Sequence, residues 1–354
     1  VTPTSTTGTC TGAAFTITVT VNPKPSVTNT ATANICSGTG PNIALTATAP
    51  SNFTWTIGTI TGSITGATAG SGATINQTLT NPSNATAGTV EYIVTPTSTT
   101  GTCTGASFTI TVTVNPKPSV TNAATAIICS GTGPNIVLTA TAPSNFTWTI
   151  GTITGSITGA TAGSGATINQ TLTNPSNATA GTVEYIVTPT STTGTCTGAA
   201  FTITVTVNPT PVLTSSLTPA AVCSATTFSY NSISSTAGST FSWIRNAVSG
   251  ISNATGSGTN GTISEVLVNT TTSPIVVTYI VSIAANSCTN SQTVTVTVNP
   301  LPVITATATA TSVCFNESAQ ITPLTYNVVS GTPIKYNIVW NAAPTNNFAA
   351  VTNE

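Results

Sequence analysis

Hydrophobic and polar residues alternate along several short stretches of the chain, with the two-residue period of a β-strand. The clearest example is FTITVTV, which occurs at 15–21 and again at 108–114. In such a run successive side chains point to opposite faces, so one face can be buried while the other meets water. No stretch has a convincing helical period. Between the first and second of these runs, further strands are predicted near 26–35, 42–48, 52–57, 73–80 and 89–95.

Turn-forming segments rich in glycine, threonine and serine separate the predicted strands every 8–15 residues. Val, Ile and Thr, which suit a pleated surface, dominate the strands themselves. About seven short strands with this spacing indicate two packed antiparallel sheets. The sequence therefore predicts an all-β fold of the antiparallel β-sandwich type.

The alternating pattern repeats with a period of 93 residues. Residues 1–93 and 94–186 differ at four positions only, and a diverged copy follows. A period of this length is too long for one turn of a solenoid and matches a whole sandwich domain of about 100 residues. The chain is thus predicted to be a tandem array of β-sandwich domains.

An Asn-Pro-x-Pro motif follows each strongly alternating run and marks the predicted joints. Proline cannot continue a β-ladder and stiffens the chain toward an extended form, so each motif is predicted to be a short, semi-rigid interdomain joint. The motifs begin at Asn22, Asn115, Asn208 and Asn299. The predicted units are the last strands of a partial repeat at 1–23, repeats at 24–116 and 117–209, a diverged repeat at 210–301 and the first part of another at 302–354.

Each unit places aromatic residues at fixed positions. The predicted third strand carries one tryptophan, and the predicted strand before the last carries one tyrosine. Such a tryptophan could stack against a sugar, but its place amid alternating apolar residues favours a core position between the sheets. The predicted core aromatics are Trp55, Trp148, Trp243, Trp340, Tyr92, Tyr185 and Tyr279.

The combined pattern ICSG, LTA, W, YIV, GTCTG and FTITVTVNPKP resembles the PKD-like and immunoglobulin-like repeat domains of Bacteroidota cell-surface proteins. The resemblance covers the three full units and both partial ones. It implies a very large secreted surface protein, exported by the type IX system and serving in adhesion or gliding. The Asp-rich, WDFGDG-like signature of classical PKD domains is absent, so the calcium-linked rigidity of such domains is not expected here.

Eight cysteines occur in regular pairs, two to a unit. They are Cys10, Cys36, Cys103, Cys129, Cys196, Cys223, Cys288 and Cys314. The chain has no CxxC motif and no histidine that could complete a zinc site. Regular cysteine pairs in an array of β-domains therefore indicate structural disulfides and an oxidising compartment.

The pairing of these cysteines has two solutions. The first joins cysteines of one unit, such as Cys36 with Cys103. In an immunoglobulin-like topology, however, these positions lie at opposite ends of a strand about 26 Å long, while a disulfide needs Cα atoms within about 7 Å. In a head-to-tail array the two kinds of cysteine would meet between neighbours, which favours Cys36–Cys196 and Cys129–Cys288. The other four would then pair outside this segment.

Composition narrows the range of functions. Only 3% of the 354 residues are charged, the net charge is −1, and neither histidine nor aspartate is present. This excludes Ser-His-Asp catalysis, histidine-ligated metals and carboxylate-rich calcium cages. Four lysines and arginines are too few for a nucleic-acid surface. No run of 18 apolar residues predicts a membrane-spanning helix. We expect no cofactor, no metal and no catalytic residue.

Two glutamates and the low charge need a separate interpretation. Glu91 and Glu184 occupy equivalent strands, but the next unit has Thr278 there, so they are interpreted as outward-facing strand residues. Threonine accounts for 87 residues, enough to hydrate the strand surfaces or to carry glycans. A nearly uncharged β-rich surface is also prone to self-association.

These features predict an extracellular, non-enzymatic structural region. The first hypothesis is a stalk or spacer in a large adhesin-like surface protein. The second is a subunit of a self-assembling extracellular filament or sheath, and the third is a carbohydrate-binding module. The expected partners are neighbouring repeats of the same chain, like chains in a fibre, and covalent glycans.

Overall fold

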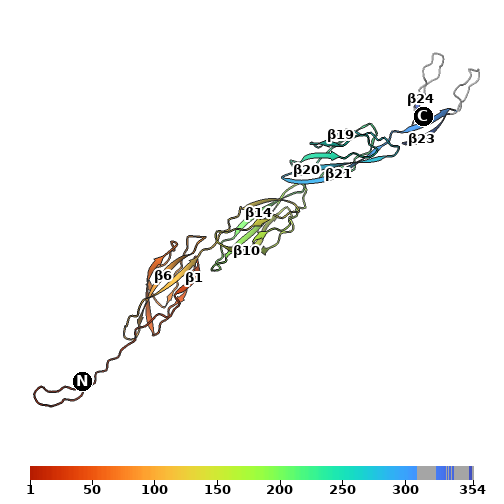
Figure 1. The fold of residues 1–354 in the computed structure, drawn as a ribbon. Helices are drawn as coiled ribbons and strands as arrows, with labels where there is room; N and C mark the ends of the chain where they lie inside the picture. The colour runs from red at the N-terminus through yellow and green to blue at the C-terminus, as the bar shows by residue number, and fades with distance from the viewer. Residues whose placement is uncertain (309–323, 332, 334, 336, 339–350, 353–354) are drawn as a thin grey trace, which may run out of the picture.

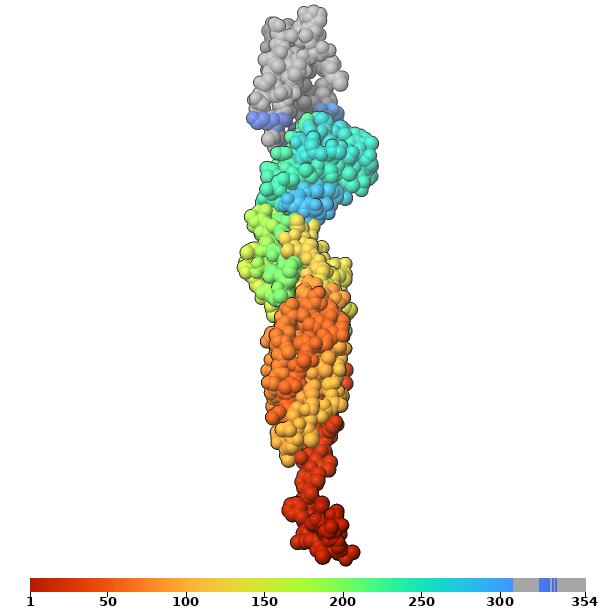
Figure 2. All heavy atoms as spheres, turned by 90° about the vertical axis from the view of Figure 1, so that its left-hand side faces the viewer, coloured from red at the N-terminus to blue at the C-terminus, as the bar shows by residue number. Residues whose placement is uncertain are grey.

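The computed structural model describes residues 1–308, 324–331, 333, 335, 337–338 and 351–352. All of its regular elements are β-strands. Three sandwich domains follow one another in an elongated row, and the N-terminal segment extends from one end (Figure 1, Figure 2). We refer to 24–116, 117–209 and 210–301 as the first, second and third domains. The predicted Trp340 and Cys314 lie outside the described residues.

The first domain contains a five-stranded sheet and a short second layer. The sheet has the order β1-β7-β6-β3-β4, and the second layer pairs β2 with β5. The strands are β1 (Thr32–Cys36), β2 (Ile43–Ala44), β3 (Ser51–Ile60), β4 (Gly70–Ser71), β5 (Thr74–Ile75), β6 (Gly88–Ser98) and β7 (Phe108–Asn115).

The second domain repeats this arrangement with the sheet order β11-β10-β13-β14-β8 and the pair β12-β9. Its strands are β8 (Thr125–Cys129), β9 (Ile136–Val137), β10 (Ser144–Thr154), β11 (Gly163–Ser164), β12 (Thr167–Ile168), β13 (Gly181–Ser191) and β14 (Phe201–Asn208).

The third domain has the sheet order β15-β21-β20-β17-β18 and the pair β16-β19. Its strands are β15 (Val222–Cys223), β16 (Thr227–Asn231), β17 (Thr240–Arg245), β18 (Gly256–Gly258), β19 (Thr262–Val266), β20 (Ile275–Ala285) and β21 (Cys288–Asn299). Beyond it, β22 (Val303–Ala308) pairs with β23 (Leu324–Ser330), and β24 (Asn337–Ile338) pairs with β25 (Val351–Thr352).

The predicted fold class is confirmed, with one departure in strand pairing. The large sheets are antiparallel except at one edge, where the first strand of each domain pairs parallel with its last strand. In the first domain this pairing sets Cys36 beside Asn115. A parallel neighbour of the last strand cannot be recognised from alternation, because the period of 2 is the same in both orientations.

The second layer is shorter than the alternation predicts. The strands expected at 42–48 and 73–80 are reduced to two residues each, supplemented by isolated bridges. Buried side chains hold this layer instead. The Asn81 amide donates to the carbonyl oxygens of Thr86 and Val114, both at 2.9 Å, and the Asn81 backbone N–H donates to the Ser37 hydroxyl. In the first domain these bonds tie the end of the second layer to β7 and to the turn after β1.

The repeated tryptophan and tyrosine of each of the three domains are buried. Trp55, Trp148 and Trp243 are 6–7% exposed, and the tyrosines at 92, 185 and 279 have no exposed surface. Each indole N–H donates to a backbone oxygen; that of Trp55 reaches Thr68 over 3.1 Å. Burial of both ring and N–H makes these tryptophans part of the core and leaves them no face for stacking with a sugar.

The third domain differs from its neighbours by a buried ionic cluster. Arg245 is 2% exposed and binds both oxygens of Glu265, at 2.8 and 3.0 Å. The Tyr279 hydroxyl donates to the same carboxylate at 2.6 Å. In the first domain the tyrosine at this position, Tyr92, donates instead to the neutral amide of Gln77 at 3.0 Å.

The cluster makes the third domain sensitive to acid. Burial raises the pKa of Glu265, but hydrogen bonds from Arg245 and Tyr279, together with the charge of Arg245, lower it overall. The contribution of the carboxylate is therefore complete above its ordinary pKa of about 4.3 and is lost as the pH falls through the lower folded-state pKa.

We therefore expect the third domain to melt at a lower temperature at pH 3.5 than at pH 7. The control is the double variant Arg245→Ile with Glu265→Gln, which carries no carboxylate at this position. Glu184, whose pKa is also lowered, by hydrogen bonds from Thr152, is common to both proteins and cancels in the comparison. Calorimetry at the two pH values measures the difference. An equal shift in both proteins would contradict the expectation.

Candidate functional site

The joint between domains is the one composite site that the repeats build in the described part of the chain. At the first joint, β7 ends at Asn115 and the chain continues through Pro116 and Pro118 into the second domain. The Asn115 amide donates to the carbonyl oxygen of Ile35 over 3.3 Å, and its own carbonyl accepts from the backbone N–H of Ser37 over 2.9 Å. The linker thus begins beside the end of β1.

The second domain contributes the hairpin between β13 and β14 to this joint. The backbone N–H of Ser191 donates to the Cys196 oxygen over 2.9 Å, and the Ser191 hydroxyl donates to the Thr193 oxygen over 2.8 Å. Gly194 of this hairpin has a φ of +76° and lies against the Asn115 side chain. Glycine is suited to both demands, because it lacks the Cβ that a positive φ and a close neighbour would exclude.

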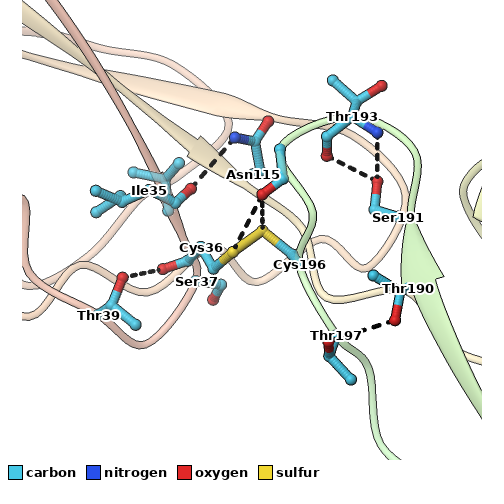
Figure 3. The surroundings of a disulfide bond; sticks show 12 residues. Ile35, Cys36, Ser37, Thr39, Asn115, Thr190, Ser191, Thr193, Cys196 and Thr197 are labelled. Atoms are coloured by element: carbon cyan, nitrogen blue, oxygen red, sulfur yellow. Dashed lines mark hydrogen bonds between the residues drawn. A yellow bond between two sulfur atoms is a disulfide. The ribbon is translucent and has the colours of Figure 1, made fainter.

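A disulfide joins the two sides of the joint (Figure 3). Cys36, at the end of β1, bonds to Cys196, and their Cα atoms lie 5.5 Å apart. Cys196 has no exposed surface. The Cys36 sulfur lies 3.7 Å from the carbonyl oxygen of Gly194. The edge strand β1 of the first domain is therefore covalently fixed to the hairpin between β13 and β14 of the second domain.

The second joint repeats this geometry in a diverged sequence. Cys129, at the end of β8, bonds to Cys288 of the third domain with a Cα–Cα distance of 5.6 Å. The Asn208 amide donates to the Asn286 oxygen over 3.0 Å. The structure thus contains the two pairs that head-to-tail packing favoured over pairing within a unit.

A second contact braces each joint away from the disulfide. Asn84, in the loop after β5, makes two hydrogen bonds to the second domain. Its side-chain amide donates to the Ser119 hydroxyl over 3.3 Å, and its backbone carbonyl oxygen accepts from the Thr141 hydroxyl. At the second joint, the Asn177 side-chain oxygen accepts from the Ser235 hydroxyl, and the Asn177 backbone oxygen accepts from the Thr236 hydroxyl. These contacts could not be predicted from the sequence, because each asparagine falls in a turn where it could equally face water.

Other predicted cysteines have no disulfide in the structure. Cys10 and Cys223 are exposed, and Cys103 is half-buried. The Cys103 sulfur lies 3.7 Å from the carbonyl oxygen of Asn22, and Gly101 lies against the Asn22 side chain. The linker before the first domain thus meets its hairpin much as the linker at Asn115 meets the next hairpin.

Gly198 tests the fit between hairpin and linker. A Cβ added there would meet the Pro118 carbonyl oxygen and the Pro189 ring. Because the first of these contacts is backbone, an alanine would push the hairpin off the linker. We expect Gly198→Ala to lower the yield of the Cys36–Cys196 disulfide on refolding, measured by peptide mapping without reduction. Gly131→Ala serves as a comparison. Its added Cβ would meet open space, but its φ of +83° makes any side chain strained, so this variant shows the effect of backbone strain without a steric contact. An undiminished yield in Gly198→Ala would contradict the assigned fit.

The two glutamates considered above serve local structure. The Glu91 carboxylate accepts from the backbone N–H of Thr59 over 3.0 Å, and Glu184 accepts equally from Thr152. These bonds lie at the irregularity in pairing between β3 and β6, and between β10 and β13. Each carboxylate thus satisfies a donor that the ladder leaves free.

The described residues lack two kinds of functional feature. Within them, no group of three or more histidine, cysteine, aspartate or glutamate side chains is close enough to hold an ion. No described helix is long and apolar enough to cross a membrane.

Comparison with known proteins gives one family match. The family described as PKD-like domain matches residues 33–118, 126–211 and 220–302. No curated protein is significantly similar to the chain.

Several solved structures match the chain at low sequence identity and low TM-score. Titin domains I67–I69 are 11% identical, with 79% of this chain and 100% of that chain covered and a TM-score of 0.34. Drosophila N-cadherin EC1–4 is 12% identical, with 79% and 76% covered and a TM-score of 0.24. The eight N-terminal immunoglobulin domains of Down syndrome cell adhesion molecule are 12% identical, with 89% and 46% covered and a TM-score of 0.26.

Proposed function

The chain belongs to the PKD-like domain family, with three such domains in tandem, and from this premise we propose that it is the stalk or spacer region of a large, secreted, adhesin-like surface protein. Domains of this type are typically structural or adhesive rather than catalytic. The two disulfides fit an extracellular location, since such bonds persist in oxidising compartments. The sequence resemblance adds a Bacteroidota source and type IX export to the proposal.

The observation that carries the proposal is the construction of the joints. A spacer must hold its domains in line, and a linker of two or three residues alone would act as a hinge. Here a linker, a disulfide and a polar contact connect the first two domains. The same three kinds of contact connect the second and third. Three separate attachments restrict both bending and rotation.

The chemistry of the described residues supports a passive role. The half-buried Glu265 carboxylate is neutralised by Arg245 and so is not free to act as an acid or base. Trp55, Trp148 and Trp243 are enclosed by the cores of their domains. Near-identical repeats suit a spacer, because a change in copy number alters reach while leaving the surface unchanged.

Electron microscopy of the full chain and of a variant lacking residues 94–186 tests the proposal. The deletion removes one repeat period, so the variant should form rods shorter by one domain, with Cys36 now bonded to Cys288. Rods that bend freely at the joints, or an unchanged length, would overturn the spacer role.

A filament subunit is the second candidate, and one surface favours it. The outer face of the third domain's large sheet exposes Ile244, Val276 and Ile280, with Ile244 paired to Ile280 across strands. On a nearly uncharged chain, such a face favours lateral association. A periodic lattice in the micrographs would support the filament over the single rod.

A further inference from the structure

The two disulfides change how a pulling force would cross the array. Each domain has an N-terminal end, where the preceding linker enters, and a C-terminal end, where its last strand leaves. In the second domain the hairpin of Gly198 lies against Pro118 at the N-terminal end. At the C-terminal end, Cys129 lies in register with Asn208.

The first and last strands therefore each cross a whole domain. In the first domain the chain passes from the linker at Lys24 along β1 to Cys36, which stands beside the departing linker. In the second domain it passes from Cys196 along β14 to Asn208. Because Cys36 bonds to Cys196, these two crossings form one covalent line.

A second line runs beside the first. It follows β8 from Lys117 to Cys129, crosses the disulfide to Cys288 and follows β21 to Asn299. Both lines run through the second domain, where β8 and β14 are parallel neighbours. We call 24–36 joined to 196–208, and 117–129 joined to 288–299, the two covalent tracks.

We propose that each covalent track carries tension across the two domains it spans and keeps that pair of domains from lengthening when it is pulled. This inference rests on the proposed spacer role and adds what such a spacer does under load. The sandwich cores, including β2 to β6 and β9 to β13, are side loops off the tracks. Unfolding them adds no length between the ends of a track.

The difference in reach is large. Between positions 24 and 210 the track measures about 27 residues, or about 90 Å when extended, while the backbone route measures about 186 residues, or about 650 Å. The track spans two domains already, so little slack is left in it. Breaking the disulfide should therefore raise the greatest extension about seven-fold.

Single-molecule pulling on the full chain tests the inference. Handles are attached through bio-orthogonal amino acids at positions 24 and 210, in a background with Cys10, Cys103, Cys223 and Cys314 changed to serine to prevent exchange. The oxidised chain should show no domain-sized unfolding step between the handles. The same molecules after phosphine reduction should release about 550 Å in such steps.

The variant Cys36→Ser with Cys196→Ser should behave like the reduced chain while keeping Cys129–Cys288, and circular dichroism checks that its domains are folded. Domain-sized steps in a chain shown by mass spectrometry to hold Cys36–Cys196 would overturn the inference. That result would leave rods in the micrographs, and hence the spacer role, in place. A lattice in the micrographs would remove the spacer role but leave the measured extension unchanged.

Discussion

Changing Arg245 to isoleucine alone should destabilise the third domain by about 3–5 kcal/mol. The substitution would leave the Glu265 carboxylate in a site where only 17% of its side chain reaches solvent, without the charge that neutralises it. Removing one partner of a buried ion pair costs far more than the pair contributes, because the remaining charge keeps its desolvation penalty. Glu265→Gln alone should destabilise the third domain by a similar amount, because it would leave the buried Arg245 guanidinium without a counter-charge.

The double variant supplies the matched control. In the first domain, Ile57 faces Tyr92 across strands, and the Tyr92 hydroxyl donates to Gln77. In the third domain, Arg245 and Glu265 take the places of Ile57 and Gln77 around Tyr279. Arg245→Ile with Glu265→Gln therefore installs a combination that a neighbouring domain already uses. It should be close to wild type in stability.

Hydrogen exchange resolved by domain measures both effects, with the first and second domains as internal references. A double-mutant cycle then gives the coupling between the two sites. Additive losses, with the double variant as unstable as the sum of the single variants, would contradict the assigned ion pair.

Removing the Cys36–Cys196 disulfide should lower the free energy of unfolding by up to about 5 kcal/mol. The bond closes a loop with a sequence separation of 160 residues, and the chain-entropy contribution of a disulfide rises with loop length. Since the loop includes most of the first and second domains, both should lose stability, while the third keeps its bond to Cys129.

Chemical denaturation of Cys36→Ser with Cys196→Ser, followed by hydrogen exchange of each domain, measures the loss. Cys223→Ser is the matched control, because this cysteine stands at the equivalent strand end and is unbonded in the structure. A loss confined to one of the two domains would mean that the bond does not couple them.

The sequence predicted those features that depend on local alternation or on the repeat. The alternation at 108–114 gives β7, and the recurrence of one tryptophan in each unit gives the core position of Trp55. The pairing of Cys36 with Cys196 follows from the length of a strand and from head-to-tail order. These inferences need only the chain's own periodicity.

The features that escaped prediction depend on contacts between segments distant in sequence. Alternation does not tell a parallel neighbour from an antiparallel one, so the placement of β1 beside β7 was missed. The second layer is held by the Asn81 side chain, which resembles any turn asparagine in sequence. The Arg245–Glu265 pair could have been found, because both charges replace uncharged residues of the first domain in the same unit.

Each disulfide joins cysteines about 160 residues apart, and this separation sets the order in which domains fold and disulfides form. Because a polypeptide is synthesised from its N-terminus, Cys36 is made 160 residues before its partner Cys196. The first domain can fold in that interval, but its own two cysteines stand at opposite ends and cannot close on each other. Each bond can therefore form only once the hairpin of the following domain has folded. Disulfide formation then trails the folding of the chain by one domain, and each completed bond shows that the next domain has folded.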